Sequence, residues 1–304
     1  MIRIRAGAPR RMRPGAAFLA VGTGLVLHAR RALLRELRQA RAVAGAARSV
    51  LLRPLPPRVA GLHLAAAQLP ADRGAAVGGD LYEVIATEHG VRVVIGDVRG
   101  HGLAARGTVA AVLDDFREAV HDEADLTGVL RRLDWVLARH VREREPDPQA
   151  AEHFVTVLLL EIAADGALHA LNCGHPWPYR LNTRGARPLT EADPLPPLGP
   201  FPLPSDVPGE HLGRLLPGET LVLYTDGVED ARDTGGRFFP LAAVLTEATR
   251  AGPPSPQAVL RAVFTRLLQH TEQRPADDVA VLVLHNDRRV SGQVSTERGA
   301  GLCR

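Results

Sequence analysis

Cysteine is scarce in this sequence, with only Cys173 and Cys303 among 304 residues, and the two lie far apart. They form neither a CxxC pair nor a disulfide framework, and zinc held by thiolates is therefore excluded. Such low cysteine usage is typical of proteins from reducing compartments, where thiols stay reduced. The sequence therefore predicts a cytoplasmic location for the folded part of the chain.

Lysine is absent altogether, and all 37 basic residues are arginines, which we attribute to genome composition rather than to function. The formal net charge is only +3. A slightly basic enzyme and a weak nucleic-acid binder both have such a balance, so charge alone names no partner. Internal repeats and low-complexity tracts are also absent, and 45% hydrophobic residues suffice for a globular core.

Long apolar runs are missing as well. The run at residues 15–29, "GAAFLAVGTGLVLHA", is short for a membrane-spanning helix, which needs about 20 residues. A secretory signal would continue with small residues for cleavage, but Arg30 and Arg31 follow here. A marginal membrane segment, an interfacial anchor and a buried helix remain open, and we favour weak membrane contact.

The chain divides into four segments. Residues 1–28 form a basic and apolar N-terminal segment, which is the candidate membrane anchor. Residues 29–54 are predicted to form a linker helix, because leucine and alanine recur there at helical intervals. The proline-rich "RPLPPR" at 53–58 ends that helix. Residues 55–286 form the globular domain, and we expect the tail at 287–304 to be disordered.

The globular domain combines short apolar strands with amphipathic helices. Strands are predicted at 61–67, 81–87, 91–97, 154–162, 167–173, 219–225 and 279–285. Helices are predicted at about 102–121, 126–143 and 256–269. The proline-crowded stretch 192–218 is expected to be irregular. Strands in bursts around paired helices favour a layered α+β fold over a regular βαβ winding.

Acidic residues mark the ends of four predicted strands. These are Asp97 after "VRVVIG", Asp226 after "ETLVLYT", Asp277 and Asp278 before "VAVLVLH", and Asp80 in "VGGDLYEV". A strand end holds its carboxylate at the rim of a sheet, so several strands can bring oxygens to one point. Hard cations such as Mg²⁺ or Mn²⁺ favour such ligands. Each Asp-Gly alone is more often a turn than a ligand, but the joint pattern predicts an acidic metal site.

Five motifs carry a family resemblance. "GGDLYEV", "GDVRGHGLAA", "NCGHPWPYRL", "LYTDGVEDARD" and "ADDVAVLVL" occur in the order and at roughly the spacing of the metal-dependent protein phosphatases. The chain most resembles the bacterial branch of sporulation phosphatases and sigma-factor regulators, over about residues 55–286. The resemblance implies a four-layer αββα sandwich, in which two antiparallel β-sheets pack face to face and a pair of helices covers each outer side.

The resemblance also implies two Mn²⁺ or Mg²⁺ ions at one end of this sandwich. Asp97 resembles the family's bridging ligand of both ions, and the carbonyl of Val98 matches the backbone ligand beside it. Asp80 resembles a second ligand of one ion. The ligands of the other ion are expected to be Asp226 and Asp277, with Asp278 as the alternative to Asp277.

Such a centre implies hydrolysis of phosphoserine or phosphothreonine by an activated water. Two ions lower the pKa of a water held between them and bind the phosphoryl oxygens, so no covalent enzyme intermediate is needed. His101 is one candidate to protonate the leaving group, but the family's glycine-histidine-glycine is more often a structural turn element, and a metal-bound water is an equal candidate. His175 is expected to shape a loop. Glu83 stands where the family often has a second aspartate. No equivalent of the phosphate-site arginine of animal-type relatives is identified.

By resemblance, the expected substrate is a phosphorylated anti-sigma-factor antagonist, and nucleic acid is not expected as a partner. Linker helices in this branch often control activity through dimerisation, so residues 29–54 suggest a homodimer. Two other classes remain open, namely a catalytically inactive phosphatase-like module that binds a partner, and a small-molecule phosphohydrolase. Retention of the carboxylates argues against the first, and selective hydrolysis of a phosphoprotein rather than nucleotides would exclude the second.

Overall fold

The computed structural model describes residues 53–71, 78–100, 102–143, 154–207, 209–250, 252, 254–272 and 275–288. The expected N-terminal segment 1–28, nearly all of the linker helix 29–54 and the tail beyond Arg288 lie outside these residues. None of the helices in the described part is both long and apolar enough to cross a membrane. The domain predicted at 55–286 makes up almost all of the described chain.

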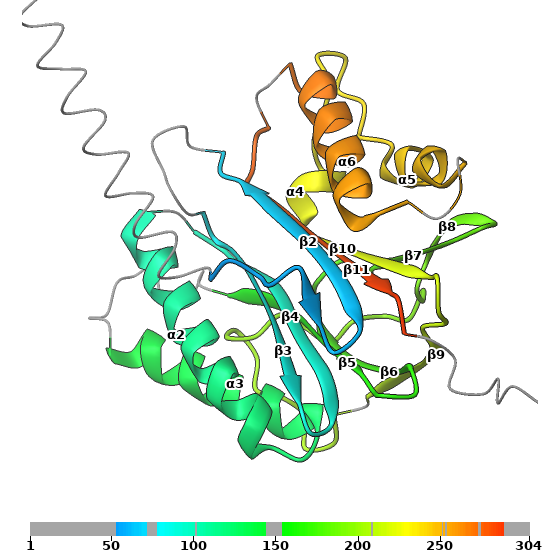
Figure 1. Ribbon diagram of the computed structural model, residues 1–304. Coiled ribbons are helices and arrows are strands. Elements are labelled where there is room, and N and C mark those ends of the chain that lie inside the picture. Colours follow the sequence, from blue (N-terminus) through cyan, green and yellow to red (C-terminus); the bar gives the residue numbers. More distant parts are fainter. Residues whose placement is uncertain are drawn as a thin grey trace, which may run out of the picture. The chain divides into compact units, whose positions relative to one another are not determined.

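Two antiparallel sheets form the centre of this domain (Figure 1). The six-stranded sheet contains, in order, β1 (Arg58–Val59), β2 (Leu62–Leu69), β11 (Val279–Asn286), β10 (Thr220–Tyr224), β7 (Tyr179–Asn182) and β8 (Gly185–Pro188). The five-stranded sheet contains, in order, β3 (Asp80–Thr87), β4 (Gly90–Val98), β5 (Val155–Ile162), β6 (Ala167–Cys173) and β9 (Glu210–Arg214). All pairings between these strands are antiparallel.

A pair of helices covers the outer face of each sheet. Helices α2 (Gly102–Asp122) and α3 (Leu126–Glu143) lie on the five-stranded sheet, against β3 to β6 (Figure 1). Helices α5 (Leu241–Thr249) and α6 (Pro256–His270) lie on the six-stranded sheet. One further turn of helix, α4 (Asp226–Glu229), follows β10 directly. The four-layer α+β sandwich implied by the family resemblance is therefore confirmed.

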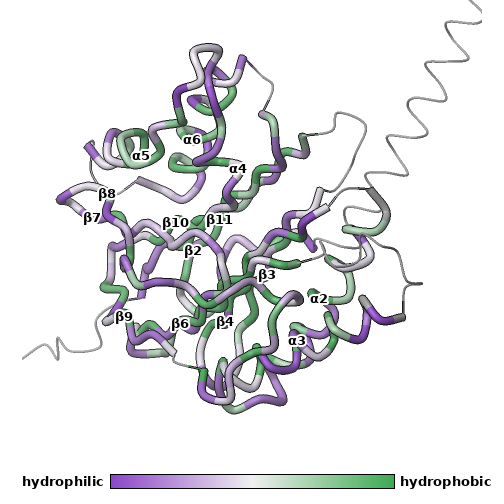
Figure 2. Tube along the Cα trace, turned by 180° about the vertical axis from the view of Figure 1, so that it is seen from behind, coloured by the Kyte–Doolittle hydropathy of each residue, from purple (hydrophilic) through white to green (hydrophobic). Residues whose placement is uncertain are grey.

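Side-chain alternation along the strands builds the hydrophobic core. In β10, Leu221 and Leu223 belong to the cluster shared with β4 and β5 between the sheets, whereas Val222 packs with α5 and α6. Strand β11 alternates in the same way. Each fully buried aliphatic side chain of this kind stabilises the fold by about 1.5–3 kcal/mol. Figure 2 shows the hydrophobic stretches that this alternation gives to the strands of both sheets.

A buried arginine fixes the helix pair α2 and α3 on its sheet. Arg92 of β4 is 0% exposed, and its Nε donates to Oε2 of Glu161 at 2.8 Å. Its other nitrogens donate to the carbonyls of Val120, Glu123 and Ala124, where α2 ends and the turn to α3 begins. Helix ends leave carbonyls without intrahelical partners and favour a nearby cation. Arg92 satisfies both requirements from inside the core.

The predicted strands and helices are all present, with small differences at their ends. The sequence patterns did not predict β1, β7, β8, β9, α4 or α5, all of which are short. Strand β9 corrects the expectation that residues 192–218 are irregular throughout, because Glu210–Arg214 pairs with β6 as an edge strand. Short edge strands contain too few apolar residues for an alternating pattern to be recognised.

Candidate metal centre

Asp80 and Asp97 lie directly opposite each other at one end of the five-stranded sheet. They are register partners where β3 begins and β4 ends. Directly opposed residues of an antiparallel pair project from the same face. That face is turned toward the other sheet, because Oγ1 of Thr225, at the end of β10, donates to Oδ2 of Asp80 at 3.0 Å. The two sheets therefore meet at these carboxylates.

Asp80 is held from several sides but is not fully satisfied. It is 1% exposed. The hydroxyl of Thr225 that donates to it also accepts the backbone N–H of Ala280, and Nε2 of Gln68 donates to its backbone carbonyl at 3.0 Å. Its second carboxylate oxygen, Oδ1, is buried without a hydrogen-bond partner in the described part of the chain. An unpaired buried oxygen is costly, and a cation would remove that cost.

The carbonyl of Val98 and the carboxylate of Asp97 face the same point beside Gly79. A Cβ added to Gly79 would lie 2.5 Å from the Val98 oxygen and 2.9 Å from Oδ1 of Asp97. The backbone N–H of Val98 donates to the carbonyl of Gly79 at 3.1 Å, which fixes this approach. Only glycine leaves both oxygens accessible from this side. These two oxygens are thus positioned to share a ligand.

The other sheet contributes Asp226, Asp277 and Asp278. Asp226 is the first residue of α4, and the pair Asp277 and Asp278 immediately precedes β11. The Asp278 carboxylate accepts the backbone N–H groups of Ala71 and Gly79, at 2.8 and 2.7 Å. Oδ1 of Asp277 accepts the backbone N–H of Asp278 at 2.7 Å. Asp278 therefore ties backbone segments together, while Asp277 makes a local turn.

Burial and mutual repulsion disturb the titration of these carboxyl groups. The pKa of Asp97 is raised to about 7, first by burial and then by the charges of Asp226, Asp277 and Asp278. Burial, followed by the charges of Asp97 and Asp278, raises the pKa of Asp80 well above its usual range. The pKa of Asp226 is also raised, first by desolvation among protein atoms, although the residue as a whole is exposed, and then by Asp277. A divalent cation would relieve this repulsion.

The donor set suits a hard divalent cation. It consists of carboxylate oxygens and one backbone carbonyl, the ligand types that Mg²⁺ and Mn²⁺ prefer and complete with waters. Within the described residues, no three His, Cys, Asp or Glu side chains converge closely enough to enclose an ion by themselves. Waters and the Val98 carbonyl would therefore have to complete the coordination shell. The orphaned oxygen of Asp80 and the raised pKa values indicate that these residues fit such an ion.

Of the two histidines considered as site residues, only His175 belongs to the described part of the chain. His101 lies outside the described residues. His175 is buried, exchanges two hydrogen bonds with Asn172 at 2.8 Å each, and its Nδ1 lies 3.0 Å from Oγ1 of Thr156. Burial lowers the pKa of His175 to about 3. This histidine is therefore neutral and organises the loop after β6, next to Thr156, the register partner of Asp97.

Glu83, the predicted substitute for a family aspartate, does not reach the carboxylate cluster. It lies three positions along β3 from Asp80, and its Oε2 accepts from both Nε and Nη2 of Arg117 in α2, at 2.9 and 2.7 Å. Hydrogen bonds between two charged groups are short and strong, and here two of them share one carboxylate oxygen. Glu83 therefore joins α2 to the edge strand of the sheet.

Sequence reasoning missed the residues that position the carboxylates. Thr225 stands directly before Asp226 in "TDG", and this position in the motif was a signal that could have been used. Gln68 and Gly79 gave no comparable signal, because their roles depend on which strands become neighbours in space. Their contacts cross between β2, β3 and the end of β4.

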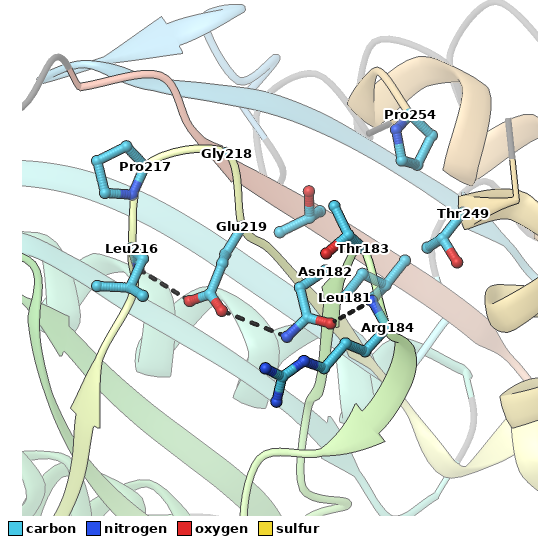
Figure 3. A pocket seen from close by; sticks show the side chains of 11 residues that line it. Leu181, Asn182, Thr183, Arg184, Leu216, Pro217, Gly218, Glu219, Thr249 and Pro254 are labelled. Atoms are coloured by element: carbon cyan, nitrogen blue, oxygen red, sulfur yellow. Dashed lines mark hydrogen bonds between the residues drawn. The ribbon is translucent and has the colours of Figure 1, made fainter. Parts of the chain in front are cut away.

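The main pockets of the described chain lie away from the carboxylate cluster or only beside it. A pocket of about 470 Å³ is formed by the β7–β8 turn, the loop before β10 and the segment between α5 and α6 (Figure 3). It lies at the opposite end of β10 from Asp226. A second hollow of similar volume, lined by Tyr179, Glu229, Asp230 and Phe238, borders α4. None of these pockets is lined by Asp80, Asp97, Asp226 or Asp277.

Comparisons with known proteins agree with this architecture. The chain is 29% identical over 215 residues to phosphoserine phosphatase RsbP of Bacillus subtilis. The aligned region covers 67% of this chain and 48% of RsbP. The chain thus spans about half the length of this curated relative. The SiaA-PP2C domain of Pseudomonas aeruginosa has the same fold, with a TM-score of 0.61, 18% identity and coverage of 84% of this chain and 98% of that one.

A second solved structure with this fold carries metal. It is the catalytic domain of the serine/threonine phosphatase PstP in complex with two manganese ions, with a TM-score of 0.53, 16% identity and coverage of 74% of this chain and 97% of that one. The family model described as Stage II sporulation protein E (SpoIIE) matches residues 87–287. The chain therefore belongs to the SpoIIE family.

Proposed function

We propose that this chain is a metal-dependent protein serine/threonine phosphatase. The observation that carries the proposal is the meeting of carboxylates from both sheets at one rim, with the pKa of Asp97 raised to about 7 and one oxygen of Asp80 unpaired. Clusters of this kind are rarely retained for stability alone, because they repel each other, and they are typical of functional sites. Membership of the SpoIIE family supports the same activity.

We assign the ligands as follows from the sequence motifs and the geometry. Asp97 would bridge two ions, Asp80 and the Val98 carbonyl would complete the site of one ion, and Asp226 with Asp277 would hold the other. Asp277 is preferred to Asp278, because the Asp278 carboxylate already accepts two backbone N–H groups. When bound, the ions would activate a water for attack on phosphorus and neutralise the phosphoryl oxygens. Mn²⁺ bound by a structural neighbour supports this choice of metal.

The other residues of the site orient these ligands. Thr225 fixes the rotamer of Asp80 by donating to Oδ2, and Asp278 fixes the backbone of Gly79 beside the Val98 carbonyl. His175 is buried and remains neutral at physiological pH, so we assign it no role as a proton donor. The proton for the serine or threonine oxygen would therefore come from solvent bound at the centre or from His101, which lies outside the described residues.

We propose a phosphorylated anti-sigma-factor antagonist as the substrate. Support comes from the family and from RsbP, a relative named as a phosphoserine phosphatase. None of the three described pockets is lined by the expected ligands, and Asp226 is exposed, which suits a phosphorylated side chain presented by a folded protein. A phosphatase of small metabolites would be expected to enclose its substrate more fully.

The test is phosphate release by the full chain from a phosphoserine protein of this class, from a phosphoserine peptide and from nucleotides. Release from the phosphoprotein should require Mn²⁺ or Mg²⁺, stop with chelator and be lost in Asp97→Asn. The matched control is Asp165→Asn, which removes an exposed carboxylate in the turn after β5, remote from the centre. Equal turnover of nucleotides would favour the small-molecule phosphohydrolase, and no turnover with either metal would favour the binding module.

A further inference from the structure

Arg99 continues the strand pairing that carries Asp97. The register pairs Asp97 with Thr156 and Val98 with Val155. The backbone N–H of Arg99 then donates to the carbonyl of Phe154 at 2.9 Å, so that these two residues form the next opposed pair. Side chains two positions apart in an extended strand project from the same face, about 7 Å apart. Arg99 therefore leaves the backbone on the same face of the strand as Asp97, two residues further along.

The Arg99 side chain is held but not neutralised. Its guanidinium carbon lies 5.1 Å from the centre of the Phe154 ring, a cation–π geometry that restrains a long side chain. Arg99 is exposed, and no described carboxylate lies within ion-pair distance of it. Arg92, Arg117 and Arg132, by contrast, are each paired with carboxylates. The arginine next to the centre thus keeps its charge available for an anion.

We propose that Arg99 binds the phosphoryl group of the substrate. The inference rests on the proposed phosphatase function and adds a substrate-binding residue to it. A guanidinium offers two parallel N–H donors that match two phosphoryl oxygens, which a single ammonium cannot do. The Phe154 ring limits the rotamers of Arg99, so less freedom is lost when the phosphate binds. Arg99 would contact phosphoryl oxygens that point away from the carboxylates. The phosphoryl oxygens on the carboxylate side would be left to the metals.

The backbone on either side of Arg99 determines where its side chain begins. Arg99 lies between Val98, whose carbonyl faces the centre, and Gly100, whose φ of 123° turns the backbone away toward α2. The Arg99 side chain is exposed beside this turn. A purely structural role would require only the stack on Phe154, and the two roles predict different kinetics.

The test compares Arg99→Gln and Arg99→Lys with Arg184→Gln in the full chain. Arg184 is exposed in the β7–β8 turn at the far end of the six-stranded sheet, so this control removes the same charge from a remote place. In Arg99→Gln, the KM for a phosphoserine peptide and the inhibition constant of inorganic phosphate should each rise about tenfold or more. Arg99→Lys should recover part of the loss. The Mn²⁺ concentration for half-activation should not change in any variant.

Unchanged KM and unchanged phosphate inhibition in Arg99→Gln would overturn the inference, provided that the wild type turns over. A second measurement separates the two proposals. Calorimetric titration of the Mn²⁺-loaded protein with inorganic phosphate needs no turnover, so Arg99-dependent binding by a wild type without phosphatase activity would reject the function and retain the phosphate site. Phosphate binding that is equal in the wild type and Arg99→Gln would reject the site whatever the activity.

Discussion

Carboxylates at the two ends of the sandwich have opposite surroundings, with hydrogen-bond donors at one end and other carboxylates at the other. At the end of β10 where Thr220 lies, Glu219 accepts the backbone N–H of Leu216 at 2.9 Å and Nδ2 of Asn182 at 3.4 Å, with a nitrogen of Arg180 at 3.8 Å (Figure 3). At the other end, Asp80, Asp97 and Asp226 face other carboxylates and have raised pKa values.

The difference distinguishes a carboxylate that stabilises the fold from the carboxylates that we propose bind metal. Glu219 has donors on its oxygens and so stabilises a loop. The carboxylates around Asp97 repel one another, and the proposed cation would balance their charge. Substitution of a carboxylate near Asp97 should lower activity and raise the stability of the metal-free protein, whereas substitution of Glu219 should lower stability and leave activity unchanged.

The largest effect is expected from Asp97→Asn. Loss of the bridging carboxylate should lower metal-dependent phosphatase activity on the order of 10³-fold, because metal ions contribute several kcal/mol to the transition state. The same substitution should raise the melting temperature of the metal-free protein, since it removes one member of a repelling group. Activity assays and thermal unfolding with chelator measure the two effects. A metal-free variant less stable than the wild type would contradict the electrostatic account.

Metal binding should stabilise the wild type but not Asp97→Asn. A free Mn²⁺ concentration 100 times the dissociation constant adds about 2.7 kcal/mol to the free energy of unfolding. For a domain of this size, the melting temperature should rise by about 5–10 °C. Differential scanning calorimetry with and without Mn²⁺ tests this without reference to turnover. An equal rise in Asp97→Asn would place the ion elsewhere in the molecule.

Glu219→Gln should show the reverse behaviour at the other end of the sandwich. The change keeps the shape of the side chain but removes the charge that faces Arg180, so the free energy of unfolding should fall by about 1–3 kcal/mol. Activity and the Mn²⁺ requirement should stay at wild-type values. Urea denaturation together with the phosphatase assay measures both, and a change in Mn²⁺ affinity would mean that the two ends are coupled.

The smallest effect concerns His175, which lies beside the carboxylate end but is neutral. Its folded-state pKa of about 3 is below the value of about 6.5 expected in the unfolded chain. Its contribution to stability is therefore complete above pH 6.5 and is lost as the pH falls toward 3, by about 1.4 kcal/mol at pH 5.5. Unfolding of the wild type and His175→Gln at pH 7.5 and 5.5 checks this, and an equal change of the unfolding free energy with pH in both would show that folding does not shift the pKa of this ring.

The sequence was sufficient to predict the individual elements and the acidic strand ends, because both depend on local patterns. Asp97 and Asp226 follow continuous apolar runs whose ends are visible in the chain. Their mutual positions depend on register and on sheet order, which single-sequence patterns do not contain. The α+β class followed from the elements themselves, but the four-layer arrangement was predicted only through the resemblance of five motifs to a family.

Residues that act through space were the hardest to predict. Thr225 reaches Asp80 across 145 positions of the chain, and Asp278 reaches Gly79 across 199. Arg99 appeared in the quoted motif only as the residue between valine and glycine. Its importance depends on the position of Phe154, which lies beyond two helices in the sequence and beside it in the sheet.

The hydrogen bonds that join the two sheets at this rim pass through the expected ligands and their immediate neighbours. Gln68 and Thr225 come from the six-stranded sheet or its margin and donate hydrogen bonds to Asp80 of the five-stranded sheet. Asp278, at the margin of the six-stranded sheet, likewise accepts a hydrogen bond from Gly79, which precedes β3. The centre therefore exists only after both halves of the sandwich have docked. A partly folded chain would lack the site entirely, so the rim should be the last region to form and the first to lose its function on denaturation.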